Sequence, residues 1–479
     1  MVSSKPQLPM ALLWGAVAAV FILSGLFIKS DSVETVSGAY LIAFASLLPA
    51  YLWISGRAKG LPIFPVYSLT FLWTYAIPLV IDHPEVVQYP PRMHLLASLT
   101  TVSFLLLGTF IWFQFVKGVH KAPTGLWVLD GKRGEPYLLV GYAAGVVLTV
   151  GFAGGWSDMD AGLFSLIRGS LLSVSNLAMF ALAYRWGTQE MPKKRVALFL
   201  SLLALYVLAN AATLLLIGAL SALLLVAVAF SLGRRKIPFI PLAVMILLIV
   251  PLHYGKGEMR IKYWKGEGGA SIKPWDYPAL YAEWVSSAWE HLSRSEDEGY
   301  DDTQSFAQRA GLINLLLTAQ DATSKDVPFL NGATYTIIPK LLIPRFLDPD
   351  KPASHEGTYL LNIHFGKQTR EDTRTTTIGW GLLNEAYANF GIWGVGGLAV
   401  ILGCLYGVVT RWSMNCPVLS ARYLFAILLI SFAYQSEFSA SVYVTALFQS
   451  TVPLLIIVFL LMKRQNLSPN QTKVIGIPS

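Results

Sequence analysis

A polar segment past the middle of the chain holds most of the side chains that could do chemistry. It runs from Pro339 to Thr377 and is rich in proline, charge and hydroxyls. Arginine forks bind phosphate oxygens in pairs and stabilise a negatively charged leaving group, and a histidine or carboxylate can take a proton. The segment therefore predicts a site for an anionic substrate. Its candidates are Arg345, Asp348, Asp350, Lys351, His355, Glu356, His364, Arg370, Arg374 and the run Thr375 to Thr377.

Two spacings in this segment raise the question of a metal. Asp348 and Asp350 could hold a divalent ion on a pyrophosphate, but the proline between them is more typical of a turn. His355 and His364 have no third histidine nearby, so we expect no zinc, although either could act as acid, base or hydrogen-bond donor. The chain has only two cysteines, which excludes a disulfide framework. We predict neither a metal nor another cofactor.

A second group of candidates follows on an apolar segment. Residues 378–409 carry one charge, Glu385, and are too long for a single untilted span, so their first turns should stand at the membrane surface. Asn389 lies one helical turn from Glu385 on the same face. A carboxylate in an apolar helix is costly in lipid. We therefore expect Glu385 to face a polar cavity or to pair with an arginine.

Two more charged residues lie at expected outer ends of spans. Arg168 could bind the substrate or extend to the lipid headgroups. Glu437, with Tyr434 and Gln435, occupies the turn between the last two apolar runs and could belong to the same site.

The elements that must position these residues are membrane helices. The chain is 54% hydrophobic and 13% charged, which excludes a set of soluble domains of ordinary composition. The uncharged run 196–233 is too long for one span and should fold back near Asn210–Thr213. We predict an all-α polytopic membrane protein with twelve spans, at 10–28, 36–54, 61–81, 95–116, 137–156, 165–184, 196–211, 214–232, 237–254, 385–409, 423–438 and 441–462.

The distribution of charge predicts the orientation. With a cytoplasmic N-terminus, 19 of the 36 Lys and Arg fall in inner loops and tails and three in short outer loops, which is the positive-inside bias. Both termini are then cytoplasmic. Residues 1–254 hold spans one to nine, 255–378 form an extracytoplasmic, mostly helical cap loop, 379–464 hold the last three spans, and 465–479 form a cytoplasmic tail. The cap is slightly acidic, so no nucleic-acid surface is expected.

An ordered set of motifs within roughly 305–400 resembles a known family. The motifs are Arg309-Ala310-Gly311-Leu312, Phe329-Leu330-Asn331-Gly332-Ala333-Thr334-Tyr335, Ile343-Pro344-Arg345-Phe346-Leu347-Asp348-Pro349-Asp350-Lys351-Pro352 and Gly381-Leu382-Leu383-Asn384-Glu385-Ala386-Tyr387-Ala388-Asn389-Phe390-Gly391. This set resembles the bacterial oligosaccharide repeat unit polymerases of the O-antigen polymerase (Wzy) type. Outside it, the resemblance extends to the number of spans and the large outer loop.

The resemblance implies a metal-independent membrane glycosyltransferase of the bacterial inner membrane. It would polymerise oligosaccharide repeat units carried on undecaprenyl pyrophosphate, with membrane lipids, a chain-length regulator and a flippase as partners and no nucleic acid. We predict Glu385, Arg345 and His355 as catalytic residues. The predicted substrate-binding residues are Arg309, Lys351, Arg374, Tyr387, Asn389 and Arg168. The hairpin Ala209-Asn210-Ala211-Ala212-Thr213 lacks the arginine that related sequences often carry there.

Two other functions stay open at this stage. An O-antigen ligase uses the same kind of lipid-linked glycan but transfers it to a lipid core acceptor. A transporter of polysaccharide or lipid carrier would need charged or broken-helix features near the bilayer midplane, which the sequence does not suggest.

Overall fold

The computed structural model describes residues 28–466 except 82, 119–122, 157–160, 215, 237, 239–246, 248–251, 254, 265–271, 294–310, 326, 346 and 375. The chain divides into two compact units. Unit 1 comprises 1–127, 304–448 and 464–479, and unit 2 comprises 128–303 and 449–463. The predicted cap, 255–378, thus contributes residues to both units.

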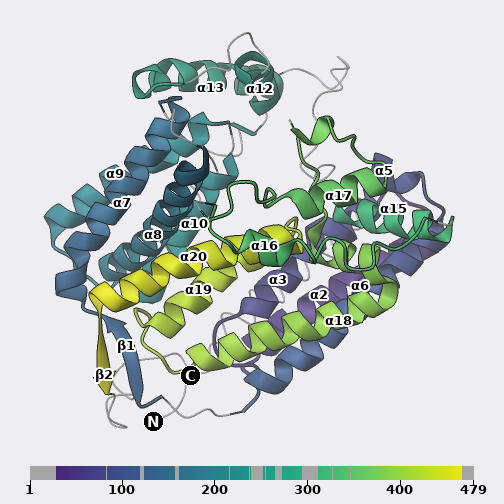
Figure 1. Ribbon diagram of the computed structural model, residues 1–479, viewed down its shortest axis with the longest axis horizontal. Helices are drawn as coiled ribbons and strands as arrows, with labels where there is room; N and C mark the ends of the chain where they lie inside the picture. The colour runs from purple at the N-terminus through teal and green to yellow at the C-terminus, as the bar shows by residue number, and fades with distance from the viewer. Residues whose placement is uncertain are drawn as a thin grey trace. The chain divides into compact units, whose positions relative to one another are not determined.

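Unit 1 is built around long apolar helices (Figure 1). Its elements are α2 (Val33–Ile54), α3 (Ile63–Phe71), the π-helical η1 (Leu72–Ala76), α4 (Ile77–Val80), α5 (Pro84–Val87), α6 (Pro91–Val116), α15 (Leu312–Ser324), α16 (Ile338–Leu341), α17 (Glu356–His364), η3 (Asp372–Arg374), α18 (Gly381–Ser413), α19 (Ala421–Ala433) and the first residues of α20 (Ala440–Leu461).

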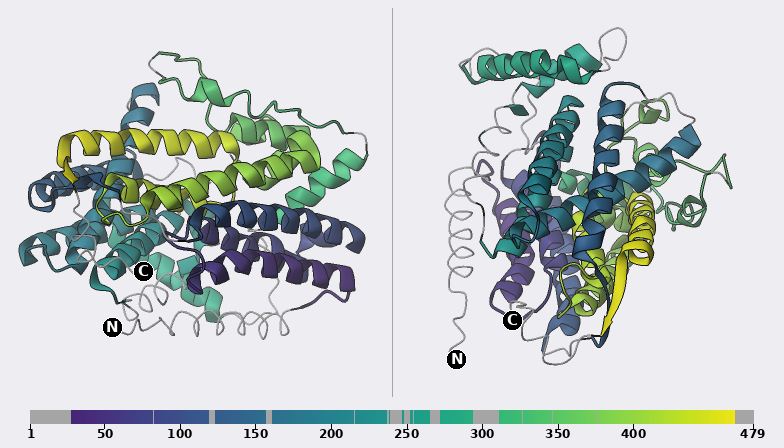
Figure 2. Two further views of the ribbon diagram at one scale, coloured as in Figure 1. Left: turned by 90° about the horizontal axis from the view of Figure 1, so that it is seen from below. Right: turned by 90° about the vertical axis from the view of Figure 1, so that its left-hand side faces the viewer.

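Helix α6 packs against both α2 and α18 (Figure 2). Glycines allow the close approach: a Cβ on Gly403 of α18 would lie 2.9 Å from the carbonyl oxygen of Gly108 on α6. Small residues at helix contacts are typical of membrane proteins, because their backbones can come together without a hydrophobic driving force. The core of unit 1 is aromatic, with Phe64, Tyr67, Phe71, Phe104, Trp112 and Tyr406 all buried.

Unit 2 is a helical bundle with a short helical pair at one end. Its elements are α7 (Gly131–Ala153), α8 (Ala161–Gly187), α9 (Lys193–Ala212), α10 (Leu216–Arg234), α12 (Lys256–Trp264), η2 (Pro274–Asp276), α13 (Tyr277–Ser293) and the remainder of α20. Strands β1 (Gly125–Leu129) and β2 (Met462–Asn466) form a two-stranded sheet. This sheet is a small exception to the all-α prediction.

The prediction of a mostly helical membrane protein is confirmed. Among the described residues, seven helices are long and apolar enough to cross a membrane, at 33–54, 63–80, 91–116, 134–153, 193–212, 381–413 and 440–461. Two shorter apolar helices lie at 218–234 and 421–433. All but the last residue of the first predicted span, 10–28, and most of the ninth, 237–254, fall outside the described residues. The number of twelve spans stays a prediction.

The predicted fold-back within 196–233 is present as a helix break. Helix α9 ends at Ala212, α10 begins at Leu216, and the two helices pack together. Between them Leu214 adopts a positive φ of 60°. The sequence signal was the polar patch that ends with Thr213, whose hydroxyl donates to the carbonyl of Asn210.

Contacts between helix ends in unit 1 divide these ends into two groups, one at each end of the unit. At one end, the backbone N–H of Lys29 before α2 donates to Val80 at the end of α4, and Gly381 at the start of α18 donates to Glu437 before α20. At the other end, the loops after α2 and α6 meet in a β-bridge, and the end of α18 meets the start of α3 through a Thr410 hydrogen bond.

Helix ends in unit 2 sort in the same way. Glu135 near the start of α7 pairs with Arg185 at the end of α8 and with Arg195 at the start of α9. At the opposite end, Ile272 N–H donates to the carbonyl of Ala153, the last residue of α7. In both units the helices therefore alternate in direction as successive membrane spans must. Which end lies outside the cell stays a prediction.

Candidate functional site

Glu385 is completely buried, with 0% of its surface exposed. One carboxylate oxygen, Oε2, accepts a hydrogen bond from the backbone N–H of Ala440, the first residue of α20. The Thr334 side chain also interacts with this carboxyl, and the other oxygen, Oε1, has no hydrogen-bond partner within 3.5 Å among the described residues. A helix N-terminus carries unsatisfied N–H groups and a partial positive charge, so it suits a carboxylate. The expected arginine partner is thus replaced by a helix end.

Glu385 belongs to a buried polar group that we call the Glu385 cluster; its other members are Thr334, Thr358, Asn389, Ser439 and Ser441. The Thr358 and Ser439 hydroxyls lie 2.7 Å apart, and those of Ser439 and Ser441 lie 3.2 Å apart. The members come from four segments: the loop before α16, α17, α18 and the start of α20. Sequence reasoning identified Glu385 and Asn389 but missed the hydroxyls, because single Ser and Thr residues carry no periodic signal.

Helix α18 is interrupted just after this cluster. Gly391 has φ 60° and ψ −143°, a conformation that only glycine adopts readily. The break leaves helical carbonyls without their usual partners. The loop before α16 supplies new ones, since Leu330 N–H donates to the carbonyl of Ala388 at 3.0 Å and Asn331 N–H donates to that of Asn389 at 3.1 Å. This pairing explains how a broken helix is tolerated at a buried position.

Asn389 joins the loop to the helix. Its Oδ1 accepts from the Gly332 N–H at 3.0 Å, and its Nδ2 donates to Thr334 Oγ1 at 2.9 Å and to the Glu385 carbonyl at 2.8 Å. Every polar atom of the Asn389 amide is therefore used in holding the fold. The predicted contact of Asn389 with substrate would require one of these bonds to open.

Tyr387 lies on a different side of α18 from Glu385 and is half-buried. Its ring meets Phe329 edge to face, with centroids 6.1 Å apart. Tyr335 instead stacks face to face on Phe390, with rings 7° from parallel. Aromatic packing thus fixes the loop against the broken helix on both sides.

Arg345 and Lys351 lie close together in one compact turn, which we call the Arg345–Lys351 loop. Arg345 Nη1 donates to the Pro349 carbonyl at 3.2 Å, and Lys351 Nζ donates to the carbonyls of Leu341 and Ile343 at 3.0 and 2.7 Å. Partial burial and the charge of Arg345 lower the pKa of Lys351 below 10.5. The loop therefore holds two like charges near one another, which Asp348 in the same loop partly offsets.

Asp348 and Asp350 also lie in this turn. The Asp348 carbonyl accepts from the Lys351 N–H at 3.2 Å, as in a turn. The negative charge of Asp348 favours the protonated form of Lys351 and so opposes the lowering of its pKa. Among the described residues, no group of three or more His, Cys, Asp or Glu is arranged to hold a metal.

His355 is exposed at the start of α17, where its ring stacks on Tyr359. The surrounding protein removes water from the charged form and lowers the pKa of His355 below 6.5. A histidine that is neutral at neutral pH can accept a proton. The adjacent Glu356 is engaged by Arg370, with N–O distances of 2.8 and 3.3 Å.

Three predicted residues have no described contact with the Glu385 cluster. Arg374 is exposed in η3. Arg309 falls outside the described residues. Arg168 lies in α8 of unit 2, and its side chain is outside what the structure describes. No hydrogen bond or ion pair among the described residues joins the Arg345–Lys351 loop to the Glu385 cluster.

Helix α17 covers the Glu385 cluster. A Cβ added to Gly357 would lie 2.9 Å from Ser441 Oγ and 3.5 Å from the Thr334 carbonyl, so α17 packs with no room to spare. Asn362 further along α17 accepts from Trp380 Nε1 at 2.6 Å and donates to the Ile378 carbonyl at 3.1 Å. Helix α17, which belongs to the polar segment predicted from the sequence, thus covers the cluster.

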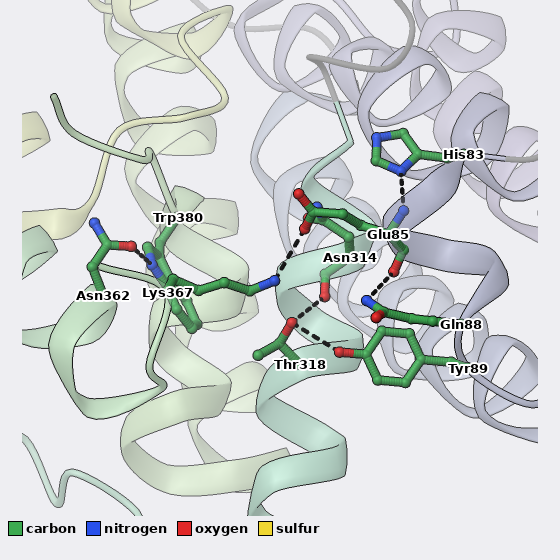
Figure 3. A network of polar contacts seen from close by, with 9 residues as sticks. All are labelled: His83, Glu85, Gln88, Tyr89, Asn314, Thr318, Asn362, Lys367 and Trp380. Carbon is green, nitrogen blue, oxygen red and sulfur yellow. Dashed lines mark hydrogen bonds and ion pairs between the residues drawn. The ribbon is translucent and has the colours of Figure 1, made fainter. Parts of the chain in front are cut away.

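A polar network joins the segment that follows α17 to α5 and α15 (Figure 3). Lys367 Nζ pairs with Glu85 Oε2 at 3.0 Å, and Asn314 Nδ2 donates to the same oxygen at 2.7 Å. The hydroxyls of Tyr89 and Thr318 lie 3.1 Å apart beside it. Glu85 was not among the predicted residues, because it precedes an apolar run with no distinguishing spacing.

Glu437 and Asn384 also adjoin the start of α18. The Glu437 carbonyl accepts from the Gly381 N–H. Glu437 is exposed, but the protein around its carboxyl group displaces water and raises the pKa of that group above 4.5. Asn384 accepts from the Tyr75 hydroxyl at 2.9 Å and donates to the Leu312 carbonyl at 2.8 Å. Asn384 was missed as a candidate, although it stands next to Glu385.

Comparison of the chain with protein-family models, with curated proteins and with solved structures gave no match.

Proposed function

We propose that the chain is a metal-independent membrane glycosyltransferase that polymerises oligosaccharide repeat units linked to undecaprenyl pyrophosphate at the outer face of the bacterial inner membrane. The observation that carries the proposal is the Arg345–Lys351 loop. Its two cations donate to backbone carbonyls rather than to carboxylates, so their charge is available to an anion. A pyrophosphate offers oxygens for both groups.

The chemistry follows from such a donor. A hydroxyl of the acceptor sugar attacks the anomeric carbon of the donor chain, and the bond from that carbon to the pyrophosphate oxygen breaks. Arg345 and Lys351 stabilise the charge that develops on the departing pyrophosphate. The proton of the attacking hydroxyl passes to His355, which is accessible and held neutral by its lowered pKa.

Glu385 enters this scheme in a different way from His355. Its carboxylate is buried beneath α17 and bonded to Ala440, so it acts on the fold of the site. We place Glu385 as a positioning residue.

The helix lengths support a site at the membrane surface. Residues 392–413, after the break at Gly391, make a helix of about 33 Å, which is enough to cross the hydrocarbon core without the first part of α18. The break and Glu385 therefore belong near one surface. A transporter would be favoured by a broken helix at the midplane, which this length does not support.

The proposal is tested by complementing a deletion strain with wild type, Arg345→Ala, Lys351→Ala and Lys340→Ala at matched membrane levels. Lys340 is an exposed lysine of α16 with no side-chain partner among the described residues, so it controls for loss of positive charge in the same segment. Surface glycan is analysed by gel and lipid-linked intermediates by mass spectrometry.

The polymerase is supported if the deletion strain and both loop variants carry only single repeat units at the surface. The Lys340→Ala strain should then still make long chains. Long chains that accumulate on their lipid carrier would instead identify a ligase. Single units confined to the cytoplasmic face would identify a transporter.

A further inference from the structure

Helix α13 of unit 2 carries three separate faces. Its buried face, formed by Tyr277, Leu280, Trp284 and Ala288, packs on the protein. At about 100° per residue, the next arc around the helix holds Ala282, Val285 and Trp289, which are exposed. The arc beyond it is polar and includes Ser286, Glu290 and Glu283. A surface helix of a water-exposed domain would have no reason for the second arc.

The exposed arc is strongly apolar. Trp289 is 72% exposed and Val285 57% exposed, and Trp275 of η2, just before the helix, is 66% exposed. We call these three residues and Ala282 the aromatic face. The Lys273 ammonium lies 5.5 Å from the centre of the Trp275 ring. Tryptophan with neighbouring lysine is the composition found where proteins meet lipid headgroups.

The position of α13 along the membrane normal follows from contacts of α13 and the residues just before it with two candidate spans, α7 and α9. The Tyr281 hydroxyl donates to the carbonyl of Leu208 at 2.6 Å, and Leu208 lies four residues before the end of α9. Just before η2, the Ile272 N–H donates to the carbonyl of Ala153, where α7 ends. Trp156, beyond the end of α7, packs on Trp275 with ring centroids 5.8 Å apart. Helix α13 therefore lies at the depth where α7 and α9 leave the hydrocarbon.

The helix is also held firmly in its orientation. Glu283 on the polar arc accepts from the Tyr263 hydroxyl of α12 at 2.9 Å, and Ser287 donates to Glu258 at 2.6 Å. Trp284 Nε1 donates to the Leu252 carbonyl at 2.8 Å on the buried side. These bonds prevent α13 from rolling to hide the aromatic face.

We propose that α13 is an interfacial helix whose aromatic face inserts among the lipid headgroups beside unit 2. The match of depth, chemistry and fixed orientation selects a bilayer surface over a water-facing role for this face. The inference is independent of the glycosyltransferase proposal, because it uses only the arrangement of unit 2.

The test measures the depth of single fluorescent labels. Cys404 and Cys416 are replaced by alanine, and a cysteine is introduced at Val285 or Trp289 on the aromatic face, or at Ser286 as the matched control on the polar arc. Each variant is labelled with the fluorophore NBD and reconstituted in lipid nanodiscs. Quenching is compared between headgroup-proximal doxyl lipids and aqueous iodide.

We expect labels at 285 and 289 to emit at shorter wavelength, to lose most of their fluorescence to doxyl lipid and to resist iodide, and the label at 286 to show the reverse. Iodide quenching at all three positions would overturn the proposal. Protection of 285 and 289 from both quenchers would also overturn it, because the face would then be covered by protein.

Discussion

The carboxyl group of Glu385 accepts a hydrogen bond from the backbone N–H of Ala440, so an acidic residue of α18 caps the N-terminus of α20. The contact spans 55 residues of sequence and lies wholly within unit 1. It connects the break in α18, the roof formed by α17 and the start of the last long helix. A residue expected to act on substrate therefore also organises the fold around the candidate site.

Replacement of Glu385 should separate its acidity from its role as a hydrogen-bond acceptor. Glu385→Gln keeps an acceptor for the Ala440 N–H, whereas Glu385→Ala leaves that donor buried and unpaired, at a cost of about 1–3 kcal/mol. We expect the alanine variant to unfold at lower temperature than the glutamine variant in the same detergent. Equal unfolding temperatures would show that the Ala440 bond contributes little to stability.

Gly391→Ala should destabilise the protein by about 1–3 kcal/mol, because its backbone conformation is strained for any side chain. A Cβ at this position would in addition lie 3.1 Å from Phe329. Gly396→Ala is the matched control on the same helix, since a Cβ there meets nothing within 4 Å. Denaturation followed by fluorescence would show the difference; a similar loss in both variants would contradict the role of the break.

Glu135→Ala should cost about 3–5 kcal/mol, since it leaves buried Arg185 without its main partner. Glu135 is 1% exposed and pairs with Arg185 at 3.0 Å and Arg195 at 2.6 Å. Glu190→Ala removes another partner of Arg185, but the Glu190 side chain is 60% exposed, so its loss should cost under about 1 kcal/mol. A comparison of the two variants by thermal unfolding would check the prediction, and equal costs would contradict it.

The pH dependence of glycosyl transfer should report on His355. A base must be neutral, and the lowered pKa keeps His355 neutral below pH 6.5, so activity should persist there and fall only as pH drops through that lowered pKa. His355→Gln should abolish most transfer. An in vitro assay with lipid-linked donor would measure both; an unchanged acid limb in the residual activity of the variant would assign the base elsewhere.

The lowered pKa of His355 also makes the stability of the folded protein depend on pH. The unfolded chain binds a proton at His355 near pH 6.5 and the folded chain at lower pH, so the unfolded state is protonated first as the pH falls. The contribution of His355 to stability is therefore present above pH 6.5 and is lost as the pH falls toward the folded pKa. His355→Gln should remove this component of the stability profile.

The sequence by itself determined the membrane class, the fold-back near Asn210–Thr213 and the concentration of charge in the segment 339–377. Each depends on local composition, which decides whether a stretch can leave water and where a helix must end. The same reasoning led to Glu385 and Asn389, because a carboxylate and an amide stand out against an apolar helix.

Only the tertiary structure decided what those residues contact. The partner of Glu385 is a backbone N–H of α20, and the break at Gly391 is stabilised by N–H groups of Leu330 and Asn331. Backbone donors are present at almost every position, so no pattern of residue types identifies which of them will meet a given carbonyl or carboxylate. That choice is made when segments distant in the sequence pack together.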